Sequence, residues 1–150
     1  MLSFRQAERK DLDCLVKMLF DDPLGKLRED GKNPLNPKYL LAFEAIIKNE
    51  NNELIIVEEQ GEVLGMLQLT FIPYLTYIGS WRCLIEGVRV HKAHRGKGLG
   101  TQIFKWAIER AKQRKCNMVQ LTSNKARVDA LRFYENLGFK ASHEGFKLSL

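Results

Sequence analysis

The residues best suited to chemistry in this sequence lie in one short run, His94 to Gly100, which reads HRGKGLG. Its three glycines alternate with Lys97 and Leu99, and Arg95 stands in front of them. Glycine lets the backbone approach a ligand without a Cβ in the way. A helix that begins here adds free N–H groups and the positive end of its dipole. The run therefore predicts an anion site of the kind that binds phosphate.

The flanking sequence supplies the elements that such a site needs. The stretch WRCLIEGVRVH, residues 81–91, predicts a strand that leads into the run. After it, apolar residues recur at helical spacing and predict one buried face of a long helix to about Arg114. They are Leu99, Ile103, Ala107 and Ala111. A further strand is predicted at CNMVQLTS, residues 116–123, so the run joins a strand to a helix within a strand–helix–strand unit.

The rest of the chain predicts a single domain, residues 1–150, of α+β (α/β layered) class. The mixed sheet is expected to be mostly antiparallel and flanked by about four helices. The remaining expected elements are a strand at 2–8, a helix from Leu12 capped by Asp11, a helix at 39–49, a hairpin at 52–72 that turns at 59–62, a turn at 77–80, a helix at 127–137 closed by Gly138, and a final strand at 145–150.

The glycine spacing excludes two familiar phosphate sites. A dinucleotide fingerprint needs its third glycine where Thr101 stands, and a P-loop needs Gly-Lys-Ser or Gly-Lys-Thr after a four-residue gap. Neither a nicotinamide nor a nucleoside triphosphate is therefore expected. The spacing alone leaves open a tight strand-to-helix turn that binds nothing.

Two motifs resemble those of a known superfamily. VRVHKAHRGKGLG resembles the cofactor motif of the GNAT superfamily of acetyl-coenzyme A dependent N-acetyltransferases, Q/R-x-x-G-x-G/A, with Arg95, Gly98 and Gly100 at its defined positions. ALRFYENLGF, Ala130 to Phe139, resembles the late helix of the same superfamily. The resemblance is close from Leu84 to Phe139, and it implies a GNAT-like fold.

The resemblance implies acetyl-CoA as co-substrate and transfer of its acetyl group to a primary amine by direct attack in a ternary complex. The edge of the strand at Val88 and Val90 would pair with the pantetheine arm. Many relatives have an asparagine where this chain has Arg127, while Asn124 lies three residues earlier. Arg127 is expected at the cofactor, with an exposed helix start as the alternative. The residues implied around the pyrophosphate are Arg95, Gly96, Lys97, Gly98 and Gly100.

The resemblance also implies two catalytic residues. Tyr134 would protonate the departing thiolate; the alternative is an aromatic residue that only packs at the helix boundary. Glu86 would deprotonate the amine, and strand alternation predicts that it shares a face with Leu84, Val88 and Val90. A carboxylate on such a face would be partly buried, with a raised pKa. The alternative for Glu86 is a structural, hydrogen-bonded carboxylate.

The acceptor is not identified by the sequence. The segment 21–30, DDPLGKLRED, holds four acids, and the segment 71–81, FIPYLTYIGSW, holds Tyr74, Tyr77 and Trp81. Acids and aromatic rings together would suit a cationic amine, whereas an ordinary polar loop is the alternative. An antibiotic, a polyamine, an amino acid and a protein amino terminus all remain open.

Composition limits the alternatives. The net charge of +6 and the pI near 9.3 favour anionic partners, which include nucleic acid. A nucleic-acid-binding regulator and a non-catalytic coenzyme A sensor are the alternative functions, although no nucleic-acid-binding motif occurs. Cys14, Cys83 and Cys116 have no disulfide or metal spacing, so we expect no metal and a cytoplasmic location. No segment predicts a membrane span, and a homodimer is left open.

Overall fold

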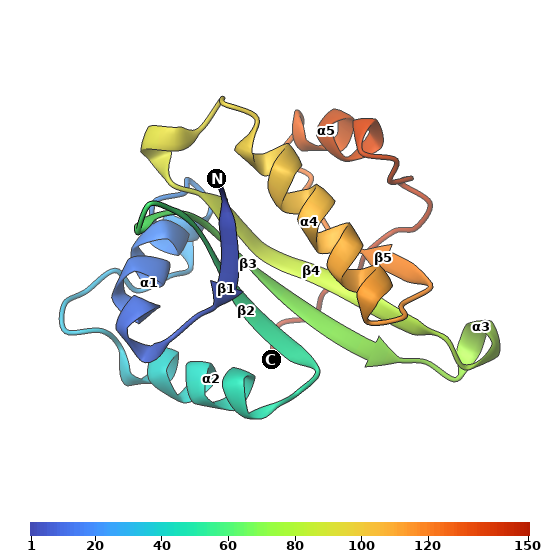
Figure 1. Cartoon of the computed structure of the whole chain (residues 1–150), viewed down its shortest axis with the longest axis horizontal. Helices are drawn as coiled ribbons and strands as arrows, with labels where there is room; N and C mark the ends of the chain where they lie inside the picture. The colour runs from blue at the N-terminus through green and yellow to red at the C-terminus, as the bar shows by residue number, and fades with distance from the viewer. The chain divides into compact units, whose positions relative to one another are not determined.

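A computed structural model describes all 150 residues of the chain. The residues form two compact units, Met1–Gln120 and Leu121–Leu150, which are described separately (Figure 1).

The first unit is built on a five-stranded sheet with the strand order β1-β2-β3-β4-β5. Neighbouring strands are antiparallel except for β4 and β5, which are parallel. The strands are β1 (Ser3–Gln6), β2 (Asn52–Glu59), β3 (Glu62–Pro73), β4 (Trp81–Val90) and β5 (Met118–Gln120). The predicted mixed, mostly antiparallel sheet and the strand–helix–strand unit at residues 81–120 are both confirmed.

The predicted hairpin of β2 and β3 forms with the predicted turn. Glu59 pairs with Glu62, and the two residues between them, Gln60 and Gly61, have φ values of 51° and 81°. Two positive φ values in a two-residue turn match the right-handed twist of the strands that the turn joins.

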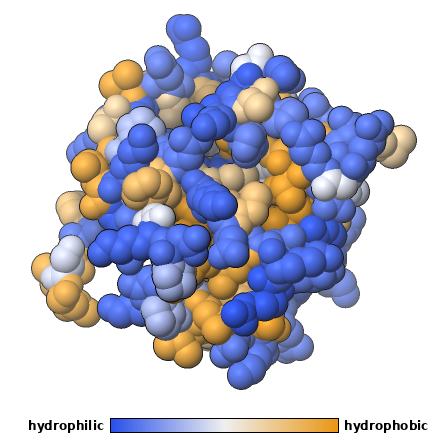
Figure 2. All heavy atoms as spheres, turned by 90° about the vertical axis from the view of Figure 1, so that its left-hand side faces the viewer, coloured by the Kyte–Doolittle hydropathy of each residue, from blue (hydrophilic) through white to orange (hydrophobic).

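One face of the sheet is covered by α1 (Leu12–Phe20) and α2 (Pro37–Lys48). Leu15 and Val16 of α1 pack in one buried cluster with Ile56 and Met66 of the sheet. Helix α2 begins after Asn36, whose side chain accepts a hydrogen bond from the Lys38 N–H, a common way to satisfy a helix start. Figure 2 views the side where α1 lies and shows mostly hydrophilic surface with apolar atoms gathered in patches between.

Asp11 does not cap α1 in the predicted way. It occupies the position before the helix, but its side chain makes no capping bond to α1. Its carboxylate accepts hydrogen bonds from Arg5 at 2.8 and 3.0 Å and from the Glu8 N–H at 2.7 Å. Asp11 therefore caps the start of the short helix η1 (Arg9–Asp11), of which it is the last residue, and ties it to β1.

The opposite face of the sheet is covered by α4 (Leu99–Gln113). The predicted apolar stripe is buried, with Ile103 and Ala107 fully inaccessible. Gly65 of β3 allows this close approach: a Cβ there would lie 3.1 Å from the Ile103 side chain. At the far end of α4, Arg110 and Arg114 both pair with the buried carboxylate of Glu53 on β2.

Three elements differ from the predictions. A short helix, α3 (Thr76–Gly79), replaces the simple turn, with φ values of 54° and 59° at Tyr77 and Ile78. Strand β5 covers only residues 118–120. The predicted strand at 145–150 is wrong, because these residues have the alternating side-chain pattern of a strand but form no ladder with a neighbour.

In the second unit, α5 (Ala130–Asn136) is the only helix. It starts three residues later than predicted, at Ala130 instead of Arg127. The predicted closure by Gly138 is confirmed: its φ is 97°, and the Phe139 N–H bonds back to the Tyr134 carbonyl at 3.1 Å, as at many helix ends.

Candidate active site

A bulge in β4 sets the direction of the side chains in the middle of the sheet. The pairing of β4 with β3 shifts there, so that Glu86 lies opposite Gln68 and Arg89 lies opposite Met66. Gly87, inside the bulge, has a φ of 61°, which favours glycine. Directly opposite residues share a face, and Met66 belongs to the cluster packed with α1. Glu86 and Arg89 therefore both lie on the α1 face.

The bulge overturns the predicted alternation along β4. Val90 pairs with Gly65, which faces Ile103 of α4, so Val90 lies on the α4 face while Glu86 lies on the other. The sequence predicts a partly buried Glu86, but its side chain is exposed. The glycine within the strand was the available signal, because a glycine inside a strand pattern often marks a bulge.

The outer edge of β4 is open beyond its pairing with β5. The two strands pair only from Arg82 to Leu84 on β4. The His91 N–H bonds to Leu64 of β3, so the backbone groups of Val88 and Val90, which are out of phase with His91, point to the other side. Each of these two carbonyls accepts a hydrogen bond from an arginine side chain. The sheet itself thus leaves this edge without a neighbouring strand.

The glycine-rich turn leads into the start of α4 as predicted. Gly96 and Gly98 have φ values of 74° and 77°, and Gly98 occupies the position before the helix with no side chain capping it. The first backbone bond of the helix runs from the Gln102 N–H to the Gly98 carbonyl. The N–H groups of residues 99–101 consequently have no partner in the helix ladder. A Cβ at either glycine would meet nothing within 4 Å, so the turn faces open space.

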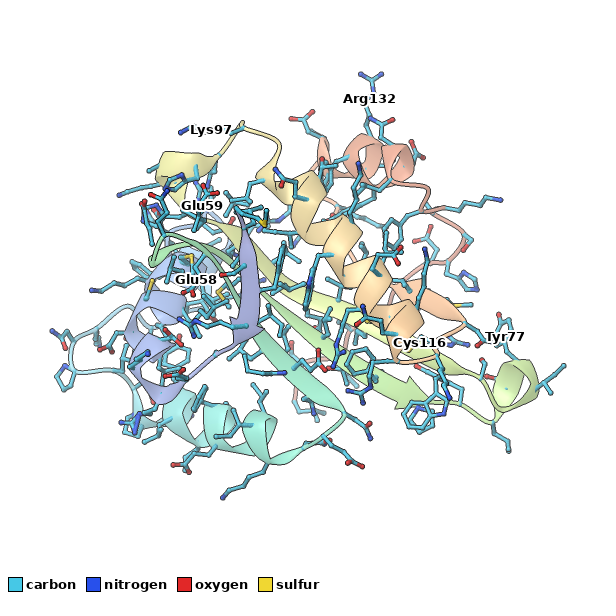
Figure 3. The ribbon with its side chains drawn as sticks, in the orientation of Figure 1. Glu58, Glu59, Tyr77, Lys97, Cys116 and Arg132 are labelled. Carbon is cyan, nitrogen blue, oxygen red and sulfur yellow. The ribbon has the colours of Figure 1, made fainter.

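The two cations of the turn are hydrogen-bonded to the protein backbone. Arg95 donates through Nε to the Val90 carbonyl at 3.0 Å and through Nη2 to the Asp21 carbonyl at 2.9 Å. The carboxylate of Asp21 lies 3.8 Å from the same Nη2. Lys97 donates to the Ala93 carbonyl at 3.1 Å, at the outer tip of the turn (Figure 3). Arg95 thereby joins the turn to the loop that follows α1.

Two of the four acids in segment 21–30 make hydrogen bonds within the loop. Asp22 is buried; it accepts a hydrogen bond from the Gly25 N–H at 2.8 Å and lies 3.8 Å from Arg89. Asp30 accepts a hydrogen bond from the Lys32 N–H at 3.0 Å, and this bond is the main cause that lowers its pKa. Asp22 and Asp30 therefore shape the loop, which leaves Asp21 and Glu29 as its more available carboxylates.

Two tyrosines of segment 71–81 lie beside an arginine of the protein, Arg82. The guanidinium carbon of Arg82 lies 3.9 Å from the centre of the Tyr74 ring and 4.9 Å from that of Tyr77. This cluster lies near α3, at the opposite end of the long strands from α1 (Figures 1 and 3). The structure therefore does not bring the acids of segment 21–30 together with these rings in one pocket.

Tyr134 lies within α5 of the second unit. Its ring meets the rings of Phe133 and Phe139 edge-on, with centroids 5.5 and 6.2 Å away. Arg127 precedes the helix and lies in a turn in which its N–H bonds to the Asn124 carbonyl at 2.9 Å. The side chain of Asn124 accepts from the Ala126 N–H at 2.9 Å, so Asn124 has a local structural role.

The hollow beside α1 lies apart from the glycine-rich turn and β4. A hollow of about 140 Å³ lies between α1 and residues 31–35, and none of its lining residues belongs to the turn or to β4. The structure contains no group of three or more His, Cys, Asp or Glu side chains that could hold a metal ion. None of its helices has the length and apolarity to span a membrane.

The model of the acetyltransferase (GNAT) family matches residues 17–139 of this chain. The chain belongs to the GNAT acetyltransferase family. It is 33% identical over 108 residues to the aminoalkylphosphonate N-acetyltransferase of Salmonella typhimurium, a match covering 72% of this chain and 70% of that protein. It is also 33% identical over 90 residues to the glucosamine 6-phosphate N-acetyltransferase of Trypanosoma brucei brucei, covering 60% of this chain and 59% of that protein.

Among solved structures, a protein of Bacillus halodurans C-125 described as a transcriptional regulator has a TM-score of 0.96 and 56% identity, covering all of both chains. The family match and the two N-acetyltransferase relatives confirm the GNAT fold and the acetyltransferase class that the two motifs predict.

Sequence reasoning missed the residues that connect the site elements. The sequence does not indicate that Arg89 and Asp22 form a pair, and the family motif assigns Arg95 only to the cofactor. The charge at these positions was visible in the sequence, but the contacts depend on the bulge and on the path of the loop after α1. Neither has a local signature beyond the glycine at position 87.

Proposed function

We propose that this GNAT enzyme transfers an acetyl group from acetyl-CoA to a primary amine by direct attack in a ternary complex. The observation that carries the proposal is the turn at Gly96 and Gly98. It opens α4 with N–H groups that have no partner in the helix ladder, and it faces open space. It also lies at the end of β4, whose outer edge has no neighbouring strand beyond its pairing with β5 at Arg82 to Leu84. An anion suits the N–H groups at the start of the helix. An extended, amide-bearing chain suits the open strand edge.

The cofactor is assigned to the residues that the family motif marks. The backbone of Gly96, Gly98 and Gly100 would bind the pyrophosphate, and the edge groups of Val88 and Val90 would bind the pantetheine arm. Arg95 and Lys97 would exchange their backbone partners for phosphate oxygens, which form stronger, charge-assisted hydrogen bonds. Arg127 is proposed as a further phosphate ligand.

The chemistry needs one base and one acid. The amine nitrogen attacks the thioester carbonyl carbon, and the carbon–sulfur bond breaks. Glu86 would take the proton that the amine loses, directly or through water, and Tyr134 would give a proton to the sulfur. Because Glu86 is exposed on the α1 face, it is accessible to an acceptor that approaches from that side.

The acceptor is proposed to be a small molecule with a primary amine. The two curated relatives are named for acceptors of this kind, and each of the named acceptors also contains a phosphonate or a phosphate group. The carboxylates of Asp21 and Glu29 would border the amine. The three free cysteines suit a reducing compartment such as the cytoplasm.

A nucleic-acid-binding regulator is the second candidate. It is favoured by the likeness to the Bacillus halodurans protein described as a transcriptional regulator and by the positive net charge. A coenzyme A sensor on the same fold would share the cofactor site without turnover.

Two titrations separate these functions. Acetyl-CoA and duplex DNA are titrated separately into the purified chain over a salt series, and mass spectrometry of the purified protein looks for co-purified coenzyme A. We expect acetyl-CoA binding and at most weak, steeply salt-dependent DNA binding. Tight DNA binding without acetyl-CoA binding would refute the enzyme. Acetyl-CoA binding without acetyl transfer to any amine in a screen would favour the sensor.

A further inference from the structure

Arg82 of β4 has an unusual environment for a positively charged side chain. Its Nη1 donates to Oε1 of Gln120 at 3.2 Å, while its Nε is buried and has no hydrogen-bond partner. The rings of Tyr74 and Tyr77 lie beside the guanidinium, at 3.9 and 4.9 Å. The ion pairs of the protein include no carboxylate partner for Arg82. The charge is therefore held in place by rings and by one neutral amide.

This arrangement leaves one edge of the guanidinium for a ligand. Gln120 takes Nη1, so the free edge is formed by Nε and Nη2. That edge can donate two parallel hydrogen bonds to a carboxylate, phosphate or phosphonate. Leaving a buried donor unpaired is unfavourable, and an anion would remove that penalty.

The location of Arg82 connects it to the proposed reaction. Arg82 and Glu86 are four residues apart in the regular part of β4, before the bulge, so they lie on the same face of the sheet. Their Cα atoms are about 13 Å apart at about 3.3 Å per residue. Gln120 faces the same side from β5, where it pairs with Leu84.

We propose that Arg82, with Tyr74 and Gln120, binds the phosphate or phosphonate group of the acceptor while the amine reacts near Glu86. This inference rests on the proposed function and adds the class of acceptor to it. The separation along β4 favours an acceptor in which the amine and the anion are several bonds apart, such as an amino sugar phosphate. A short aminophosphonate spans less of this distance.

Tyr77 lies where an anion would reach the guanidinium of Arg82. Its side chain is 59% exposed, and its ring is the more distant of the two from the guanidinium. Rotation of this exposed ring would open a path for an anion to the guanidinium of Arg82, while the ring of Tyr74 would stay against its plane.

The test compares two acceptors that differ only in the phosphate. With acetyl-CoA in excess, coenzyme A release is measured with glucosamine 6-phosphate and with glucosamine. We expect kcat/KM to be at least about tenfold higher for the phosphorylated sugar, and Arg82→Gln to lower that value by about 10- to 100-fold through KM. The value for glucosamine should change little, and Arg82→Lys should retain part of the preference.

Controls separate the anion site from general effects. Arg9→Gln removes the same charge at an exposed position and should leave the preference for the phosphorylated sugar unchanged. The pair 2-aminoethylphosphonate and ethanolamine presents a phosphonate at a shorter spacing and should show a smaller preference; a larger one would contradict the spacing argument. Calorimetric titration of glucosamine 6-phosphate into the protein loaded with coenzyme A measures binding without turnover.

Several results would overturn the inference. They are equal kcat/KM values for the two sugars, an equal loss for both in Arg82→Gln, and the same loss in Arg9→Gln. Binding of acetyl-CoA with no binding of glucosamine 6-phosphate would reject the anion site alone, whereas no binding of acetyl-CoA would reject the proposed function itself.

Discussion

Gly87 is the residue at which the side chains of β4 change faces, so it decides which later residues share a face with Glu86. Gly87 has a φ of 61° and lies in the bulge, where β4 has one residue more than the paired stretch of β3. Without the bulge, Glu86 and Val90 would lie on one face; with it, they lie on opposite faces of the sheet. A chemically reactive side chain can thus be directed to the α1 side while the strand edge beyond it serves another ligand.

Glu86→Gln tests the base at this position. Glutamine keeps the size and the hydrogen bonding of the side chain but cannot take a proton. In the wild type we expect the acid limb of kcat/KM against pH to report a group that must be deprotonated. In the variant this limb should disappear or move to the pKa of the acceptor amine. An unaltered limb would mean that the amine arrives already deprotonated.

Tyr134→Phe tests the acid. Phenylalanine keeps the ring and its edge contacts with Phe133 and Phe139 but removes the hydroxyl proton. We expect kcat to fall by about 10²- to 10⁴-fold, with little change in the Kd of acetyl-CoA measured by calorimetry. A variant with the full wild-type kcat would remove Tyr134 from the mechanism.

At the scale of elements, the turn before α4 places glycines at positive φ where we propose that acetyl-CoA binds. Gly98→Val places a branched side chain at a φ of 77°, so we expect a loss of roughly 1–3 kcal/mol in the free energy of unfolding. It should also weaken acetyl-CoA binding severely, because the new side chain occupies the open side of the turn. The measurements are urea unfolding and calorimetry.

Gly61→Val is the matched control for that variant. Gly61 has a φ of 81°, and a Cβ there also meets nothing within 4 Å, but it lies in the β2–β3 hairpin. The control should lose a similar amount of stability and keep its affinity for acetyl-CoA. Equal losses of affinity in both variants would show that the effect comes from instability and not from the turn.

The elements show what could be predicted from the sequence. Helices α2 and α4 and the β2–β3 hairpin follow from side-chain periodicity and turn residues, which are local properties. The strand predicted at 145–150 failed because alternation describes side chains, whereas a strand also needs a neighbour for its backbone. Of the candidate site, the motif residues could be named from the sequence, but the orientation of Glu86 and the contacts of Arg95 depend on the bulge and on distant loops.

At the scale of the whole molecule, acid stability depends on contacts between β1 and η1. The two hydrogen bonds from Arg5 are the main cause that lowers the pKa of Asp11. A lowered pKa stabilises the fold at every pH above the ordinary value of about 3.9. This contribution disappears as the pH falls below that value and through the folded pKa of Asp11.

Asp11→Asn should therefore lose about 1–3 kcal/mol of unfolding free energy at neutral pH, because its hydrogen bonds no longer involve a charged acceptor. The difference from the wild type should shrink when urea unfolding is repeated at about pH 3, where the wild-type carboxylate is becoming protonated. Asp13→Asn, at an exposed position of α1, is the control and should change little at either pH. A constant difference between Asp11→Asn and the wild type would contradict the linkage.

The pairing of Arg110 and Arg114 with Glu53 has a mechanical consequence for the other end of α4. A helix of 15 residues is a lever about 22 Å long. A tilt of the helix axis by only about 1° displaces one end relative to the other by about 0.4 Å, most of the range of distances over which a hydrogen bond forms. The ion pairs with Glu53 on β2 and the buried face of the helix keep α4 in place. Two arginines at one end of the helix therefore help to fix the position of the glycine-rich turn at the other end.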